Sequence, residues 1–283
     1  MPSAQRVART IPPLLAAALL LGSCAPAPDP SALPRTSDHV REVPVAAPPG
    51  PGQPAAAGSI PKDAVAKNST IGPDGLPPGS LYRNPTNGRD EIVVEDIQNT
   101  AVLIGDSQSE PSRSWTRRAL ADLGFNVVFC GGSGTGFVAG NGVRGNYIDA
   151  LENGDWHLPY GAPPLVLIEG GGNDATKGAS DFDIEEHAER LIEAVEQRYP
   201  AAEVVLVGTL ARGAQAGGGR RTQVDSLLGA VAKEYGLSFV SVGDWLTRYG
   251  LSQYLADDRH LNAEGHELAG ELLSRRLEAL GIV

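Results

Sequence analysis

The sequence TAVLIGDSQS, which runs from Thr100 to Ser109, joins a continuous apolar run to a glycine and a polar turn. A short apolar run that ends in this way is typical of a strand buried on both faces of a parallel sheet. Four further runs rich in valine, leucine and isoleucine follow it. The pattern therefore predicts a sheet of five strands. The four later runs occupy residues 126–130, 165–169, 204–208 and 238–242.

Segments with helical periodicity separate these runs. Apolar residues recur three and four positions apart in residues 111–123, 184–199 and 222–235, and again after Asn262. Strands that alternate with helices predict an α/β fold, in which right-handed crossovers give a parallel sheet covered by helices on both faces. We expect this domain to occupy residues 92–283.

Polar residues suited to acyl transfer follow the predicted strands. Ser107 comes after the first strand, the glycine-rich segment 131–136 after the second and Asn173 after the third, while Asp257 and His260 precede the last helix. In such sheets ligands bind beyond the carboxyl ends of the strands. A serine nucleophile needs an imidazole base that is oriented by a carboxylate, and the oxyanion needs hydrogen-bond donors. These residues supply each of those parts.

The four blocks and their order resemble those of the SGNH hydrolases, also called GDSL esterases and lipases, over about residues 97–283. The resemblance implies a three-layer α/β/α sandwich similar to flavodoxin, with a five-stranded parallel sheet. It also implies that Ser107 is the nucleophile and that Asp257 and His260 complete the triad. In the same way it implies an oxyanion hole formed by the backbone N–H of Ser107, by Gly134 and by the Asn173 side chain.

Two features depart from the common family pattern. Gln108 stands where leucine is usual in the first block, and the second block holds so many glycines that Gly132 and Gly136 are alternatives to Gly134 as the oxyanion donor. Neither departure affects the predicted triad.

Two competing motifs are weaker. Residues 134–139 match a dinucleotide fingerprint, but Gly140, Gly142 and Gly145 oppose the helix that this fingerprint must open. Residues 105–109 approach the α/β-hydrolase elbow but lack its last glycine. The sequence also holds no HExxH motif, P-loop or closely spaced cysteine pair, so we expect neither a metal nor a cofactor.

The amino-terminal segment has the features of an export signal. Arg6 and Arg9 precede an apolar run at residues 11–21, which is shorter than the ~20 residues that a membrane-spanning helix needs. The run ends in LGSC at Cys24, which resembles the bacterial lipobox, whose cysteine is diacylated and becomes the first residue of the mature protein. Ordinary cleavage without lipidation is the alternative. We expect a lipoprotein signal peptide at residues 1–23 and a lipid anchor at Cys24.

Residues 24–91 are rich in proline, alanine and glycine and hold few large apolar side chains. A segment of this composition cannot bury enough surface to offset the entropy of ordering, so the sequence predicts a disordered tether. With the anchor, it predicts an exported protein of the bacterial cell envelope, attached to the outer face of the cytoplasmic membrane or secreted.

The charge of the chain argues against one class of partner, and its cysteine content limits the disulfides that it can form. The chain has 23 basic and 34 acidic residues and a formal charge of −11, which repels nucleic acid. Cys130 is the only cysteine besides Cys24 and is expected to be a buried structural residue, with a Cys24–Cys130 disulfide as the alternative. We expect a monomer.

The predicted function is that of a lipid-anchored serine esterase without a cofactor. Its substrates would be small acyl esters on cell-envelope glycans, or lipid esters. An O-acyltransferase with the same triad and a non-catalytic binding domain are the alternatives. Aromatic residues in the loop of residues 131–164 either line the substrate pocket or pack in the core. They are Phe137, Tyr147, Trp156 and Tyr160.

Overall fold

The computed structural model describes residues 73–282, so the predicted signal peptide, Cys24 and most of the predicted tether lie outside the described residues. Five parallel strands form the central sheet in the order β4-β3-β5-β6-β7. This is the strand order of flavodoxin-like folds, and it confirms the predicted five-stranded parallel sheet. The strands are β3 (Thr100–Gly105), β4 (Asn126–Gly131), β5 (Leu165–Glu169), β6 (Glu203–Val207) and β7 (Ser238–Val240).

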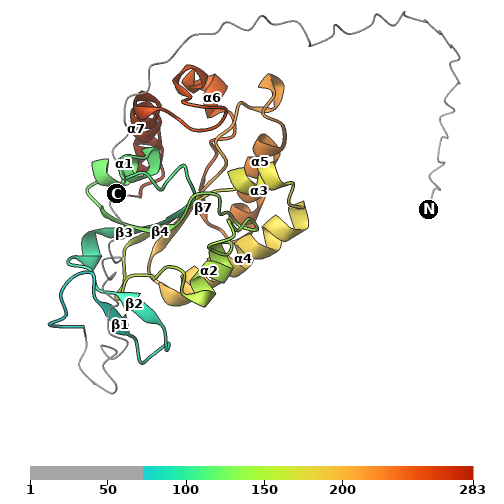
Figure 1. The fold of residues 1–283 in the computed structure, drawn as a ribbon. Helices are drawn as coiled ribbons and strands as arrows, with labels where there is room; N and C mark the ends of the chain where they lie inside the picture. Colours follow the sequence, from blue (N-terminus) through green and yellow to red (C-terminus); the bar gives the residue numbers. More distant parts are fainter. Residues whose placement is uncertain (1–72, 283) are drawn as a thin grey trace, which may run out of the picture. The chain divides into compact units, whose positions relative to one another are not determined.

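Helices cover both faces of the sheet and give the predicted three-layer sandwich (Figure 1). Helices α2, α4 and α5 pack on one face, whereas α1, α6 and α7 pack on the other. None of the helices in the described part of the chain is long and apolar enough to cross a membrane. The helices are α1 (Trp115–Asp122), α2 (Tyr147–Asn153), α3 (Gly172–Lys177), α4 (Asp181–Arg198), α5 (Gly219–Glu234), α6 (Trp245–Arg248) and α7 (Ala263–Ala279).

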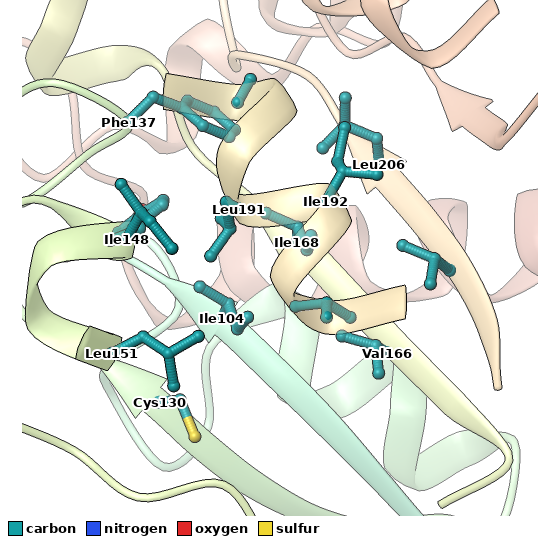
Figure 2. Packing of buried hydrophobic residues seen from close by; sticks show 14 of the residues in the cluster. Ile104, Cys130, Phe137, Ile148, Leu151, Val166, Ile168, Leu191, Ile192 and Leu206 are labelled. Atoms are coloured by element: carbon teal, nitrogen blue, oxygen red, sulfur yellow. The ribbon is translucent and has the colours of Figure 1, made fainter. Parts of the chain in front are cut away.

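Alternation along each strand builds the two cores. In β3, Val102 and Ile104 face the core shared with α4, whereas Ala101 and Leu103 face the core shared with α1. All four side chains are fully buried, as expected for a central strand covered on both faces. Figure 2 shows Ile104 in the first of these cores, among residues from β4, β5 and α4.

The helices differ from the predicted ranges at their ends. Helix α1 begins at Trp115 and not at residue 111, because the hydroxyl of Ser114 caps it by accepting a hydrogen bond from the N–H of Arg117. The predicted loop of residues 131–164 contains α2, which the Asn146 side chain caps. Helices this short bury too few apolar residues to show a clear period in the sequence.

The aromatic residues of segment 131–164 belong mainly to the core. Phe137, Tyr147 and Trp156 are buried in the cluster below α2 and α4, and the rings of Phe137 and Tyr147 pack edge to face. Tyr160 packs against Tyr82. Of the two interpretations that the sequence left open, core packing is therefore the correct one for the three buried rings.

The predicted boundary of the tether at residue 91 is wrong, because a β-hairpin lies within the last part of the predicted tether. Strands β1 (Leu81–Arg83) and β2 (Asp90–Ile92) pair antiparallel, and the N–H of Ile92 donates to the carbonyl of Leu158 in the folded domain. The composition of this segment did not indicate folding, because its stability comes from contacts with residues far along the chain. Ordered structure therefore begins before Ile92.

A buried ion pair fastens this hairpin. Glu91, which is 2% exposed, accepts hydrogen bonds from the side chains of Asn84 and Asn87 and a bidentate pair from the Arg198 guanidinium, with Nη2 2.9 Å from Oε2. Arg198 ends α4 and also donates to the carbonyl of Gly161. Each oxygen of the Glu91 carboxylate therefore accepts two hydrogen bonds, one from an asparagine and one from Arg198.

We expect Arg198→Met to destabilise the protein, because it leaves the Glu91 carboxylate buried without its cation. Breaking a buried pair in this way costs about 3 to 5 kcal/mol. The free energy of unfolding from urea titrations measures the loss. Arg83→Met is the control, since the Arg83–Asp90 pair is exposed and such pairs contribute about 0 to 1 kcal/mol. Equal effects of the two substitutions would show that the Glu91 pair does not hold the hairpin.

Candidate active site

The residues that the sequence singled out follow the strands at the carboxyl edge of the sheet or precede the last helix. Ser107 lies two residues beyond β3 and Gly134 lies three residues beyond β4. Asn173 is in α3, directly after β5, and the segment with Asp257 and His260 precedes α7. Since β3 pairs with both β4 and β5, the first three of these segments begin side by side.

The turn that carries Ser107 is tightly hydrogen bonded. The carbonyl of Asp106 accepts the N–H groups of Ser109 and Glu110, and its carboxylate accepts the N–H of Gln108 at 2.8 Å. A Cβ at Gly105 would lie 2.6 Å from that of Ser109, so the chain can turn this sharply only with glycine there. The turn leaves the Ser107 side chain partly exposed at the edge of the sheet.

Three side chains form a hydrogen-bonded line. Ser107 Oγ lies 2.9 Å from His260 Nε2, and His260 Nδ1 lies 2.8 Å from Asp257 Oδ2. The second carboxylate oxygen of Asp257 accepts the backbone N–H groups of Arg259 and His260. A neutral imidazole with its proton on Nδ1 satisfies both contacts, and its Nε2 lone pair then faces the serine hydroxyl.

The environment keeps Asp257 ionised. The hydrogen bond from the His260 side chain, with the two backbone N–H groups, holds the pKa of Asp257 well below its ordinary value. An ionised carboxylate beside Nδ1 fixes the tautomer and stabilises the imidazolium that forms when the ring takes a proton. The line of three groups can therefore accept the proton of a serine hydroxyl.

The backbone donors distinguish the three candidate glycines. The N–H of Gly132 donates to the carbonyl of Gly105, and the N–H of Gly136 donates to the carbonyl of Ala139. Within residues 73–282, neither the N–H of Gly134 nor that of Ser107 has an acceptor. Gly134 also has a φ of +79°, a conformation that favours glycine. These two N–H groups are the ones that can bind a substrate oxygen.

Asn173 lies between two segments, the turn of residues 105–110 that carries Ser107 (the serine turn) and the glycine-rich residues 132–139 after β4 (the glycine loop). Its Nδ2 donates to the Asp106 carboxylate and to the carbonyl of Thr135, both at 2.9 Å. Asp106 and Thr135 are the chain neighbours of Ser107 and Gly134. Since both amide hydrogens already have acceptors, donation to a substrate oxygen requires Asn173 to share one of them. Asn173 thus also holds the two loops together.

Two buried carboxylates that the sequence analysis gave no role also shape the site. Asp174, which is fully buried, accepts the consecutive backbone N–H groups of Phe137, Val138 and Ala139 and so fixes the end of the glycine loop. Burial raises the pKa of Asp106 to about 6, although the N–H of Gln108 opposes that shift. Their positions in the sequence could have pointed to them, since Asp174 directly follows Asn173 and Asp106 directly precedes Ser107.

Cys130 is a structural residue, as predicted. It is buried at the end of β4, and burial raises the pKa of its thiol to about 12, so it is not a nucleophile at neutral pH. Across residues 73–282, no group of three histidine, cysteine, aspartate or glutamate side chains is arranged to hold a metal ion.

Comparisons with known proteins bear on the family and the fold of this chain. A multidomain esterase of Ruminococcus flavefaciens is 26% identical over 142 residues, which are 48% of this chain and 18% of that protein. The chain thus spans under a fifth of the length of this relative. The structure of an active-site mutant of a family two carbohydrate esterase from Clostridium thermocellum has a TM-score of 0.52 at 16% identity and covers 69% of each chain.

A carbohydrate acetylesterase from Sinorhizobium meliloti, Est24, has a TM-score of 0.46 at 23% identity over 64% of this chain and 99% of its own. At 16% identity the structure of the family two carbohydrate esterase bears on the fold alone. The sequence profile of the GDSL-like Lipase/Acylhydrolase family matches residues 99–268, which is more than half of the chain. The protein therefore belongs to the GDSL-like lipase/acylhydrolase family.

Proposed function

We propose that the protein is a serine ester hydrolase in which Ser107, His260 and Asp257 form the catalytic triad. The observation that carries the proposal is the 2.9 Å contact between Ser107 Oγ and His260 Nε2, with Asp257 on the other ring nitrogen. A hydroxyl, a base and an ionised orienting group in line are the requirements of nucleophilic acyl transfer. Membership of a lipase and acylhydrolase family supports the same assignment.

The reaction would proceed through an acyl-enzyme. His260 takes the Ser107 proton as Oγ bonds to the acyl carbon, and the resulting imidazolium gives that proton to the departing alcohol as the ester bond breaks. Water then attacks the acyl carbon with His260 again as the base, which frees the acid and restores Ser107. The N–H groups of Ser107 and Gly134 stabilise the oxyanion in both steps, and Asn173 Nδ2 adds a third donor.

The preferred substrates in this proposal are short acyl esters of glycans, with lipid esters as the second choice. His260 and Asp257 have side chains that are 35% and 52% exposed, so the site can accept an ester on a large polar molecule. Three of the four aromatic residues that would have lined a deep acyl pocket lie in the core instead. The family two carbohydrate esterase among the similar structures agrees with a glycan ester.

The function is tested with the p-nitrophenyl esters of acetate, butyrate and octanoate. We expect the acetate and butyrate esters to be hydrolysed fastest. Ser107→Ala should lower kcat by roughly 10⁴-fold or more and abolish labelling by a fluorophosphonate. Ser226→Ala is the control, because this exposed hydroxyl bonds only to the backbone of its own helix. Full activity of Ser107→Ala would refute the nucleophile, and faster hydrolysis of the octanoate ester would refute the short-acyl preference.

Asn173→Ala tests the oxyanion donor. Because the interaction strengthens only in the transition state, we expect kcat to fall by roughly 10²- to 10³-fold with little change in KM. The lost bonds to Asp106 and Thr135 should also lower the free energy of unfolding by about 1 to 3 kcal/mol. Thr176→Val, in the same short helix, is the control. If kcat per folded molecule is unchanged in Asn173→Ala, the residue only holds the two loops together.

We further propose that the mature protein is lipid-anchored at Cys24 in the bacterial cell envelope. Two or more acyl chains give stable membrane attachment where one gives marginal binding. Cells fed an alkyne-tagged fatty acid should label the wild-type protein and not Cys24→Ser. That variant should appear in the medium or remain as the longer precursor. A Cys24→Ser protein of mature length that still sediments with membranes would contradict the anchor.

A further inference from the structure

Within the described part of the chain, two hydrogen bonds join the loop that carries Asp257 and His260 to the serine turn. Residues 255–261 close on themselves through the Leu255–Leu261 bridge and a bond from the N–H of Ala256 to the carbonyl of His260. Leu261 is buried in the core and Leu255 packs against that core, whereas residues 256–258 are exposed, with the Asp258 side chain 74% exposed. The stretch between the two leucines, which carries Asp257 and His260, needs further contacts to keep one position.

Gln108 supplies one of those contacts, and the catalytic serine supplies the other. Gln108 Nε2 donates to the carbonyl oxygen of Arg259 at 2.8 Å, and Ser107 Oγ meets His260 Nε2. Consecutive residues of the turn thus contact consecutive residues of the loop. The serine bond must break during each reaction cycle, so the Gln108 bond is the one that lasts throughout.

The buried amide of Gln108 contributes little net stability. Its side chain is 4% exposed, and within residues 73–282 no group donates to the buried Oε1. Rotating the amide would place Oε1 against the Arg259 carbonyl, and two acceptors repel each other, so the orientation is fixed. Leaving a buried polar atom without a partner costs at least as much free energy as one neutral hydrogen bond contributes.

We propose that Gln108 is a positioning residue that holds the loop of residues 255–261 so that His260 stays within hydrogen-bond distance of Ser107. Its backbone N–H is itself fixed by the Asp106 carboxylate, which makes the turn a firm base for the contact. The proposal rests on the triad proposed above. Gln108 touches no reacting atom and acts only through His260.

The test measures kcat, KM and the melting temperature of Gln108→Leu with p-nitrophenyl acetate. Leucine fills a similar space and removes both the donor and the unpartnered oxygen. We expect kcat to fall roughly 10- to 100-fold because the base is less well placed, with KM within about twofold of wild type and an equal or higher melting temperature. A purely structural Gln108 would give the reverse, a lower melting temperature and an unchanged kcat.

Two further variants make the result specific. Gln108→Met keeps the length of the side chain without a donor and gives the same readout if leucine does not fold. Gln98→Leu is the matched control, because Gln98 also donates to a backbone carbonyl but is exposed, and it should leave kcat unchanged. Wild-type kcat in both Gln108 variants would overturn the proposal.

A double-mutant cycle with His260→Ala separates this proposal from the triad itself. If Gln108 acts through His260, Gln108→Leu should lower activity in the wild-type background and have no further effect on the residual activity of His260→Ala. Equal fold-losses in the two backgrounds would overturn the positioning role while leaving the triad in place. Full activity of His260→Ala alone would instead refute the triad.

Discussion

The close pairing of β3 with β4 and β5 is the constraint on which the site depends. Gly105 and Gly131 are register partners at the ends of β3 and β4, and a Cβ on Gly131 would lie 2.0 Å from the carbonyl oxygen of Gly105. Only glycine allows the two backbones to approach so closely. The pairing brings the serine turn and the glycine loop out of the sheet side by side, and β5 places α3 next to them.

Buried polar groups then fix the loops that the sheet has brought together. Asp174 holds the glycine loop by three backbone N–H groups, and Asn173 joins that loop to Asp106 in the serine turn. Hydrogen bonds to ionised groups in a buried site are among the stronger ones in proteins. This arrangement leaves the N–H groups of Ser107 and Gly134 without an acceptor among the described residues, as an oxyanion site requires.

The proposed base, His260, comes from a different kind of element. The turn and the glycine loop are anchored in the sheet, whereas His260 lies on an exposed loop that precedes α7. An exposed base is accessible to a large substrate but is less firmly held. The ionised Asp257 orients the ring from within the loop, and Gln108 links the loop to the rigid part of the site. In the proposed mechanism the two contacts have separate tasks, since the Asp257 contact sets the tautomer of His260 and the Gln108 contact sets its position.

The strands, the layer architecture and the residues at the strand ends could be predicted from the sequence alone. Continuous apolar runs such as residues 100–105 identify buried strands without any other information, and the parallel order of the sheet places Ser107 and Asn173 at one edge. Interactions between distant residues could be read only from the folded structure. They include the contacts of Asp174 and Gln108 and the hairpin held by Glu91 and Arg198, and the same holds for the N–H of Gly134, which has no acceptor within residues 73–282. Each depends on which donors and acceptors meet after folding, and the local pattern of one segment carries no information about the partner that another segment will supply.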